Sequence, residues 1–354
     1  MKKRLVAMLL GLVMTASVIA GCGGAPEVKE EAKQEAVTEE AAEESTEASA
    51  EVAEGEVKTG VSIQASASGQ NAAAGENGNV TTDINVVAVT VDANGVITSC
   101  AIDSIKAAAS FDASGKLNSD LEVVLSKNEL GENYGMKKGS SIGKEWNEQA
   151  AALAEYAVGK TIEEVKTSAI DESGSVKDAD LASSATMYAG GFVAQMEEAV
   201  NNAAAMGASA GDVLKITSTN TLSSSKDAGA EDGLVQIDAY ISVVTLNGDV
   251  ITGCYIDSVQ GKASFNAKGE ITSGADGEVQ TKNDLGESYG MKAASGIGKE
   301  WNEQAQAFAD YVNGKTVAEV LGMEVKDGKT ADADLASSVT IYVGNFLELI
   351  KKAE

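Results

Sequence analysis

Two matching runs of small and hydroxylated residues have the composition of an anion-binding site. Residues 180–186 are Asp-Leu-Ala-Ser-Ser-Ala-Thr, and residues 334–340 are Asp-Leu-Ala-Ser-Ser-Val-Thr. At a helix start, free backbone N–H groups and the positive end of the helix dipole favour a phosphate, and small side chains let it come close. Any capped, serine-rich helix start has a similar composition, so the pattern alone does not identify a ligand. The candidate residues are Asp180, Ser183, Ser184 and Thr186, with Asp334, Ser337, Ser338 and Thr340.

The other side chains that could bind a metal or react have structural explanations. Asp178 and Asp332, with the aspartates two positions later, precede a predicted helix, where N-capping and interaction with the helix dipole are the expected roles. Calcium binding is the alternative, but no EF-hand spacing is present. Cys100 and Cys254 lie on apolar strand faces, so we expect buried thiols, with a reactive thiol or an interdomain disulfide as alternatives.

Two tyrosines are harder to explain by packing. Tyr134 and Tyr289 lie in polar loops flanked by glycine, where each ring could stack on a planar ligand or pin the loop. Trp146 and Trp301, in contrast, lie on an amphipathic helix pattern and are expected in the core. The two tyrosines are therefore added to the candidate binding residues.

The composition excludes several kinds of chemistry. The 354 residues include no histidine, so Ser-His-Asp and Cys-His catalysis are impossible and a hydrolase is disfavoured. Lys and Arg number 27 against 54 Asp and Glu, and the net charge of -27 argues against a nucleic-acid partner. The three cysteines, one of them in the leader, form neither a disulfide framework nor a CxxC motif. We expect no catalytic residue and no metal site.

The first residues have the pattern of an export signal. Three basic residues at 2–4 precede an apolar run over 5–20, which is short for a membrane span and typical of a signal peptide. The run ends in Ile-Ala-Gly-Cys, which resembles the bacterial lipobox, where cleavage precedes the cysteine and its thiol receives lipid. This resemblance predicts a signal peptide over 1–21, a lipidated Cys22 and a cell-membrane anchor facing outside the cytoplasm. An ordinary signal peptide with a chance cysteine is the alternative.

The rest of the chain is a duplication behind a tether. Residues 22–59 are mostly Glu, Ala, Lys, Ser and Thr, cannot bury enough apolar surface to fold alone, and are predicted to be disordered. The segment 143–150 recurs identically at 298–305, within a longer internal repeat. The predicted domains are therefore 60–207 and 208–354, each large enough for its own core.

Each copy has strand patterns followed by helix patterns. Residues 84–91 are rich in strand formers, and the turn Asp-Ala-Asn-Gly at 92–95 leads into a second strand. A helical apolar period then begins at Trp146, a capping box at 161–164 opens a second helix, and 180–203 predicts a third. This order indicates an α+β fold with two tandem homologous domains, each an antiparallel sheet with packed helices. We expect each domain to fold alone.

Over nearly all of both copies the chain resembles the FMN-binding domain found in sodium-pumping quinone reductase subunits and in flavinylated surface lipoproteins. The family pattern is Asp-x-x-Ser-Gly-Ala-Thr at the start of a late helix, preceded by a hairpin and by a helix closing on Gly-Lys-Thr. The matching residues are Asp180, Ser183, Ala185 and Thr186 in the first copy, and Asp334, Ser337 and Thr340 in the second.

The resemblance implies covalent FMN, because the family's threonine receives FMN through a phosphoester bond made by a flavin transferase. The acceptors would then be Thr186 and Thr340. The chain departs from the family at the glycine, which is Ser184 in one copy and Ser338 in the other, and at an alanine, which is Val339. A serine adds bulk where backbone would approach a phosphate.

The resemblance and the leader together imply a function. They predict a lipid-anchored flavoprotein that carries electrons at the cell surface, with a flavin transferase and redox proteins as partners. A carrier or binding protein is thus favoured over an enzyme. The alternative is a non-catalytic ligand-binding or structural lipoprotein of the cell envelope that has lost flavin.

Overall fold

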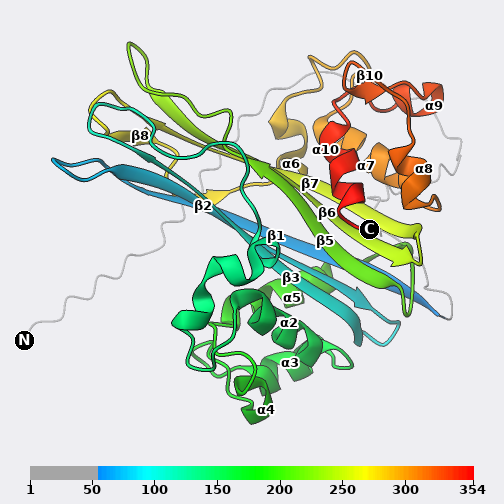
Figure 1. Cartoon of the computed structure of the whole chain (residues 1–354). Coiled ribbons are helices and arrows are strands. Elements are labelled where there is room, and N and C mark those ends of the chain that lie inside the picture. Colours follow the sequence, from blue (N-terminus) through cyan, green and yellow to red (C-terminus); the bar gives the residue numbers. More distant parts are fainter. Residues whose placement is uncertain (1–54) are drawn as a thin grey trace, which may run out of the picture. The chain divides into compact units, whose positions relative to one another are not determined.

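The two copies form matching sets of long antiparallel strands (Figure 1). The computed structural model describes residues 55–354, so the predicted signal peptide, Cys22 and nearly all of the predicted tether lie outside the described residues. The long strands are β1 (Glu56–Gln70), β2 (Gly78–Val91) and β3 (Ile97–Phe111) in the first copy, and β5 (Val213–Thr221), β6 (Gly233–Asn247) and β7 (Val250–Phe265) in the second.

The predicted β-turn joins β2 to β3. The side-chain Oδ1 of Asp92 accepts from the backbone N–H of Asn94 at 2.9 Å and of Val96 at 2.8 Å. Gly95 has φ 75° and Gly248, in the turn between β6 and β7, has φ 62°, values that favour glycine. The hairpin prediction is confirmed in both copies.

These strands form two antiparallel sheets. One has the order β3-β2-β1-β4, and β1 pairs with both β4 (Ala204–Ser209) and β9 (Asp276–Val279). The other has the order β5-β6-β7-β8, with β8 spanning Ile271–Ser273. Since β9 belongs by sequence to the second copy, a strand of one copy completes the sheet of the other. A small separate hairpin consists of β10 (Val325–Lys326) and β11 (Lys329–Thr330).

Helices pack on one end of each sheet, α2 on β3 and α5 on β1 and β2, with α7 and α10 in the same places in the second copy. The buried face of α2 contains Trp146, Ala150, Leu153 and Ala157, as the helical period predicts. The first copy has α1 (Lys127–Leu130), η1 (Gly131–Tyr134), η2 (Met136–Lys138), α2 (Trp146–Ala157), α3 (Ile162–Ala169), α4 (Ala179–Ala182) and α5 (Gly190–Asn201). The second has α6 (Lys282–Leu285), η3 (Gly286–Tyr289), α7 (Trp301–Val312), α8 (Val317–Leu321), α9 (Ala333–Ala336) and α10 (Gly344–Lys351).

Side-chain caps fix where the short helices begin. Thr161 accepts from the backbone N–H of Glu164 and Thr316 from that of Glu319, so both predicted capping boxes are confirmed. Within residues 55–354, no helix has the length and apolar character needed to cross a membrane.

The predicted third helix is wrong as a continuous element. Instead of running from 180 to 203, it splits into the single turn α4 and the longer α5. Between them, the backbone N–H groups of Thr186 and Met187 donate to a side chain instead of to helical carbonyls, as described below. The same break separates α9 from α10.

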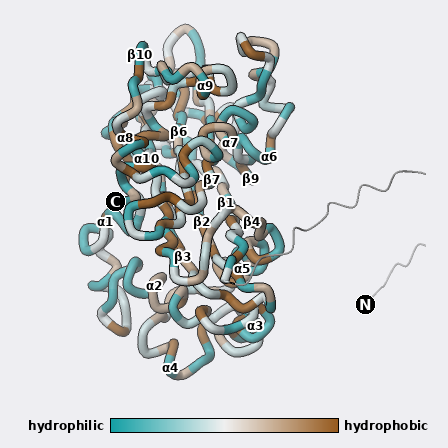
Figure 2. Tube along the Cα trace, turned by 90° about the vertical axis from the view of Figure 1, so that its right-hand side faces the viewer, coloured by the Kyte–Doolittle hydropathy of each residue, from teal (hydrophilic) through white to brown (hydrophobic). Residues whose placement is uncertain are grey.

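The described residues belong to one compact unit with three hydrophobic cores. Two cores lie between a sheet end and the helices of the same copy, on opposite sides of the paired sheets (Figures 1 and 2). The third joins strands of both copies, including Ile84, Phe111, Ile237 and Phe265. Each copy has a core of its own, as expected, and the shared third core is the feature that the sequence did not predict. The predicted α+β class with antiparallel sheets is confirmed. The division at 207/208 into separate domains stays a prediction.

Candidate functional site

The run predicted to bind phosphate begins within the single turn α4 and continues into the loop before α5, so it does not open a long helix. Thr186 follows the single turn α4 and precedes α5, within residues 183–189, the first threonine loop. Thr340 lies within residues 337–343, the second threonine loop. Thr186 is exposed and Thr340 is half-buried, so solvent reaches both side chains.

A fully buried glutamine braces the first threonine loop. The Oε1 of Gln149 accepts from the backbone N–H of Thr186 at 2.8 Å and of Met187 at 3.0 Å. Its Nε2 donates to Ser140 Oγ at 3.2 Å and to the carbonyl of Lys144 at 3.1 Å. One amide group therefore fixes the threonine loop against the glycine-containing loop that precedes α2.

The second copy repeats this brace with a different sequence around it. Gln304 Oε1 accepts from the backbone N–H of Thr340 at 2.8 Å and of Ile341 at 3.3 Å. Its Nε2 donates to Ser295 Oγ and to the carbonyl of Lys299, both at 3.2 Å. Sequence reasoning missed both glutamines, although each lies in the eight-residue segment that is identical in the two copies.

The brace changes what these loops can bind. The N–H groups of Thr186 and Met187 already have a partner, so the expected free N–H groups at a helix start are not found there. The threonine hydroxyls have only long contacts, 3.4 Å from Thr186 Oγ1 to Gln149 Oε1 and 3.2 Å from Thr340 Oγ1 to Gln304 Oε1. Each loop thus offers a hydroxyl on a fixed backbone.

The acidic and serine residues in and before the predicted site take different places around the single turns α4 and α9. Asp178 Oδ1 accepts from the N–H of Leu181 at 2.9 Å, which confirms its prediction as an N-cap, and Asp332 does the same in the second copy. Asp180 follows in the first turn, exposed, and its carbonyl accepts from Ser183 Oγ at 2.7 Å. Asp334 and Ser337 repeat this bond, while Ser184 and Ser338 follow half-buried.

Each of the two candidate tyrosines shares a lysine with a tryptophan. In the first copy Lys127 Nζ is 5.2 Å from the ring centroid of Tyr134 and 4.8 Å from that of Trp146. In the second, Lys282 Nζ is 5.0 Å from Tyr289 and contacts two further rings. These cation–π contacts favour the loop-pinning role of the tyrosines.

The two lysines, Lys282 buried and Lys127 half-buried, were missed from the sequence. Each follows an N-cap, Ser126 or Thr281, in a capping box that recurs in both copies, and this recurrence was the available signal. Burial lowers the pKa of Lys282 to about 8 and also lowers the pKa of Lys127. Burial also raises the pKa of two nearby carboxyls, Asp103 and Asp257, to about 6.

The cysteines are core residues, as predicted. Cys254 is buried, Cys100 is half-buried against the core of its copy, and both thiols are free. Burial raises the pKa of each thiol to about 12, so neither forms a thiolate near neutral pH. The alternatives of a reactive thiol and an interdomain disulfide are not supported. In the part of the chain that the structure describes, no three Cys, Asp or Glu side chains come together as a metal site.

Comparison with known proteins gives one short match. A chlorophenol reductase from Desulfitobacterium hafniense is 54% identical over 41 residues, which is 12% of this chain and 12% of that relative. No model of a known protein family matches the chain, and no solved structure matches it. The match spans too little of either chain to show a family.

Proposed function

We propose that the chain is an exported, lipid-anchored carrier of flavin, with FMN attached to Thr186 and Thr340. The observation that carries the proposal is the duplicated presentation of a threonine hydroxyl on a loop braced by a buried glutamine. Two copies of this arrangement persist although the flanking residues differ, Met187 in one loop and Ile341 in the other. A carrier with two attachment points on one tethered chain suits electron transfer at a cell surface.

The residues of the threonine loops suit covalent attachment of the FMN phosphate, and they do not form a pocket that would enclose it. The exposed hydroxyl of Thr186 is open to a modifying enzyme, and the fixed backbone holds it in one place. The serines that replace the family's glycine cause no backbone strain, because Asp327 alone among the described non-glycine residues has positive φ. The bonded N–H groups do not cradle a phosphate, so flavin would extend outward from the loop.

Flavin, when bound, supplies one- and two-electron redox chemistry, and the chain's own residues attach and present it. The first copy is the better acceptor, because Thr186 is exposed whereas Thr340 is half-buried. Val339, buried beside Thr340, is also bulkier than Ala185 and β-branched, which stiffens this part of the second loop.

The experiment is co-expression with a flavin transferase, followed by intact mass and in-gel flavin fluorescence. We expect one or two added FMN units in the parent, loss of one in Thr186→Ala, and loss of all in the double variant with Thr340→Ala. Thr167→Ala, a threonine on α3, is the matched control and should keep the parent's flavin. Flavin that survives in the double variant would show that the acceptors lie elsewhere.

A second function is favoured by one observation. The backbone N–H groups of both threonine loops are already bonded to glutamine, as expected for a protein that has lost flavin and kept the fold. The chain would then be a non-catalytic ligand-binding or structural lipoprotein of the cell envelope. Protein purified from its own host, without added FMN mass beyond the lipid, would favour this function.

A further inference from the structure

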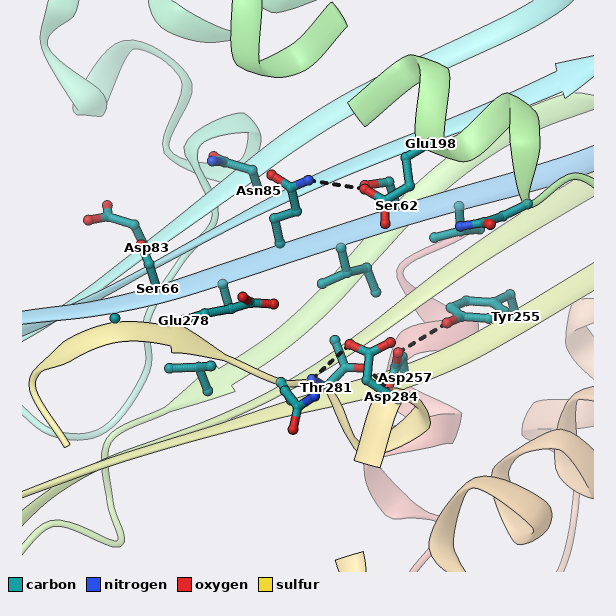
Figure 3. Close-up of a pocket in the computed structure, with 18 residues that line it drawn as sticks. Ser62, Ser66, Asp83, Asn85, Glu198, Tyr255, Asp257, Glu278, Thr281 and Asp284 are labelled. Atoms are coloured by element: carbon teal, nitrogen blue, oxygen red, sulfur yellow. Dashed lines mark hydrogen bonds between the residues drawn. The ribbon is translucent and has the colours of Figure 1, made fainter. Parts of the chain in front are cut away.

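A cavity of about 840 Å³ lies between the two copies (Figure 3). Its walls come from β1, β2 and α5 of the first copy and from β7, β9 and α6 of the second. None of its lining residues, all of them in the described part of the chain, is a lysine or arginine. The acidic residues that line it are Asp83, Glu198, Asp257, Glu278 and Asp284.

Two of these carboxylates are held in place by hydrogen bonds. Glu198 Oε2 accepts from Ser62 Oγ at 2.8 Å and from Gln64 Nε2 at 3.0 Å, which fixes it over β1 (Figure 3). Asp257, only 1% exposed, accepts from the hydroxyl of Tyr255 at 3.0 Å and from the backbone of the residue after it. Fixed like charges around one cavity repel each other unless a cation lies between them.

The opposite junction between the copies contains such a cation. There a smaller cavity of about 320 Å³ is lined by Asp103, Glu129 and Lys352. Lys352 Nζ lies 2.5 Å from Glu129 Oε1 and 2.6 Å from the carbonyl of Ser218 on β5. A primary ammonium therefore sits between a carboxylate at the first helix of one copy and the first strand of the other.

Several residues of the two junctions are equivalent, and one equivalent pair differs in charge. Asp257 and Asp284 correspond to Asp103 and Glu129. Glu198 lies eight positions after the start of α5 and Lys352 eight positions after the start of α10, so the two positions are equivalent. The larger cavity therefore has a carboxylate where the smaller one has an ammonium group. The larger cavity thus keeps the acceptors of the ammonium site, adds acidic residues and has room for a ligand.

We propose that this cavity binds a linear polyamine, a ligand whose ammonium groups take the place that Lys352 Nζ takes at the opposite junction. The volume suits a small organic molecule rather than a single metal ion, and several carboxylates around the walls suit a ligand with several ammonium groups. The site lies apart from the threonine loops, so binding does not depend on flavin.

The test is isothermal titration of the mature, unlipidated chain with spermidine at pH 7.5 and about 0.15 M salt, where distant surface charges are screened. We expect saturable binding of one spermidine, and weaker binding of the diamine putrescine. Glu198→Lys should weaken spermidine binding at least tenfold, because it places an ammonium where Lys352 lies at the other junction. Glu198→Gln keeps acceptors for Ser62 and Gln64 but loses the charge, and should weaken binding about fivefold.

Glu172→Lys, an exposed site outside the cavity with the same change in charge, is the matched control and should bind spermidine like the parent. Equal weakening by this control would mean that the acidic chain attracts polyamines without a site. Calcium binding with equal or higher affinity, lost in the same variants, would identify a metal site instead. Absence of saturable spermidine binding would overturn the proposal.

Discussion

Phe111 and Phe265 stack face to face, with ring centroids 4.1 Å apart and an angle of 8° between the rings. Each is the last residue of the third long strand in its copy, β3 or β7. A residue that contacts its own equivalent is characteristic of a twofold arrangement. The two copies therefore meet in the way that two subunits of a symmetric dimer meet, within one chain.

We predict that removing one ring of this pair strongly destabilises the protein. Phe111→Ala should lower the free energy of unfolding by about 3–5 kcal/mol, because both rings are fully buried. Chemical denaturation gives the value, and Phe265→Ala with the double variant completes a mutant cycle. The double variant should lose less free energy of unfolding than the two single variants together, because each single substitution already removes the stacking contact. Strict additivity would contradict the pairing.

A second prediction concerns the separated copies. The fragments 60–207 and 208–354 each expose the apolar strand face that forms the shared core. Separation also removes β9, which lies in 208–354, from the sheet of the first fragment. We expect each fragment alone to unfold at lower denaturant than the whole chain, and the mixture to regain stability by association. Sedimentation and urea titration measure both effects. Fragments as stable as the intact chain would restore the expectation of independent domains.

A third prediction tests the glutamine brace. Gln149→Ala leaves the N–H of buried Met187 without its partner and should cost about 1–3 kcal/mol. Hydrogen exchange at the amides of Thr186 and Met187 should accelerate more than elsewhere in the copy. Gln306→Ala, on the exposed side of α7, is the control and should change neither quantity. Unchanged exchange in Gln149→Ala would mean that the loop is held by other contacts.

The buried aspartates predict a dependence of stability on pH. Burial raises the pKa of Asp103 and Asp257 from 3.8 to about 6, so the folded protein holds these protons more tightly than the unfolded chain does. Their contribution is therefore full below pH 4 and is lost as the pH rises to about 6. Each group contributes up to about 3 kcal/mol. Asp257→Asn should become more stable relative to the parent between pH 4 and 6, as measured by urea unfolding at each pH. Parallel curves would contradict the shifted pKa.

The periodic features of the fold were predictable from the sequence because each depends on local interactions. The turn at Gly95, the capping box at Thr161 and the buried face of α2 follow from residues a few positions apart. The shared core and the transfer of β9 to the first sheet were not, because alternating burial along a strand does not say which surface covers it. The local sign of a second packing face was the continuous burial of both strand faces in the later half of β2 and of β6.

The form of the threonine loops could not be predicted from the sequence. The sequence pattern places Thr186 and Ser183 in one long helix, but they follow the single turn α4, and Thr186 is bonded to Gln149, which is 37 positions earlier in the chain. A long-range side-chain bond of this kind leaves no periodic signal. The cavity carboxylates Glu198 and Asp284 come from different copies, so only the tertiary structure brings them together.

The last prediction concerns the proposed lipid anchor at Cys22, which lies outside the residues that the structure describes. Cys22→Ser removes the thiol that would receive lipid, so the variant should lose lipidation and leave the membrane fraction. Intact mass, metabolic labelling with a fatty acid and fractionation measure this. Cys100→Ser is the matched control, because the Cys100 thiol packs against the core of the first copy. This variant should keep its lipid, although the substitution will lower the stability of the fold. A Cys22→Ser protein that still fractionates with membranes like the parent would show that a different segment provides the anchor.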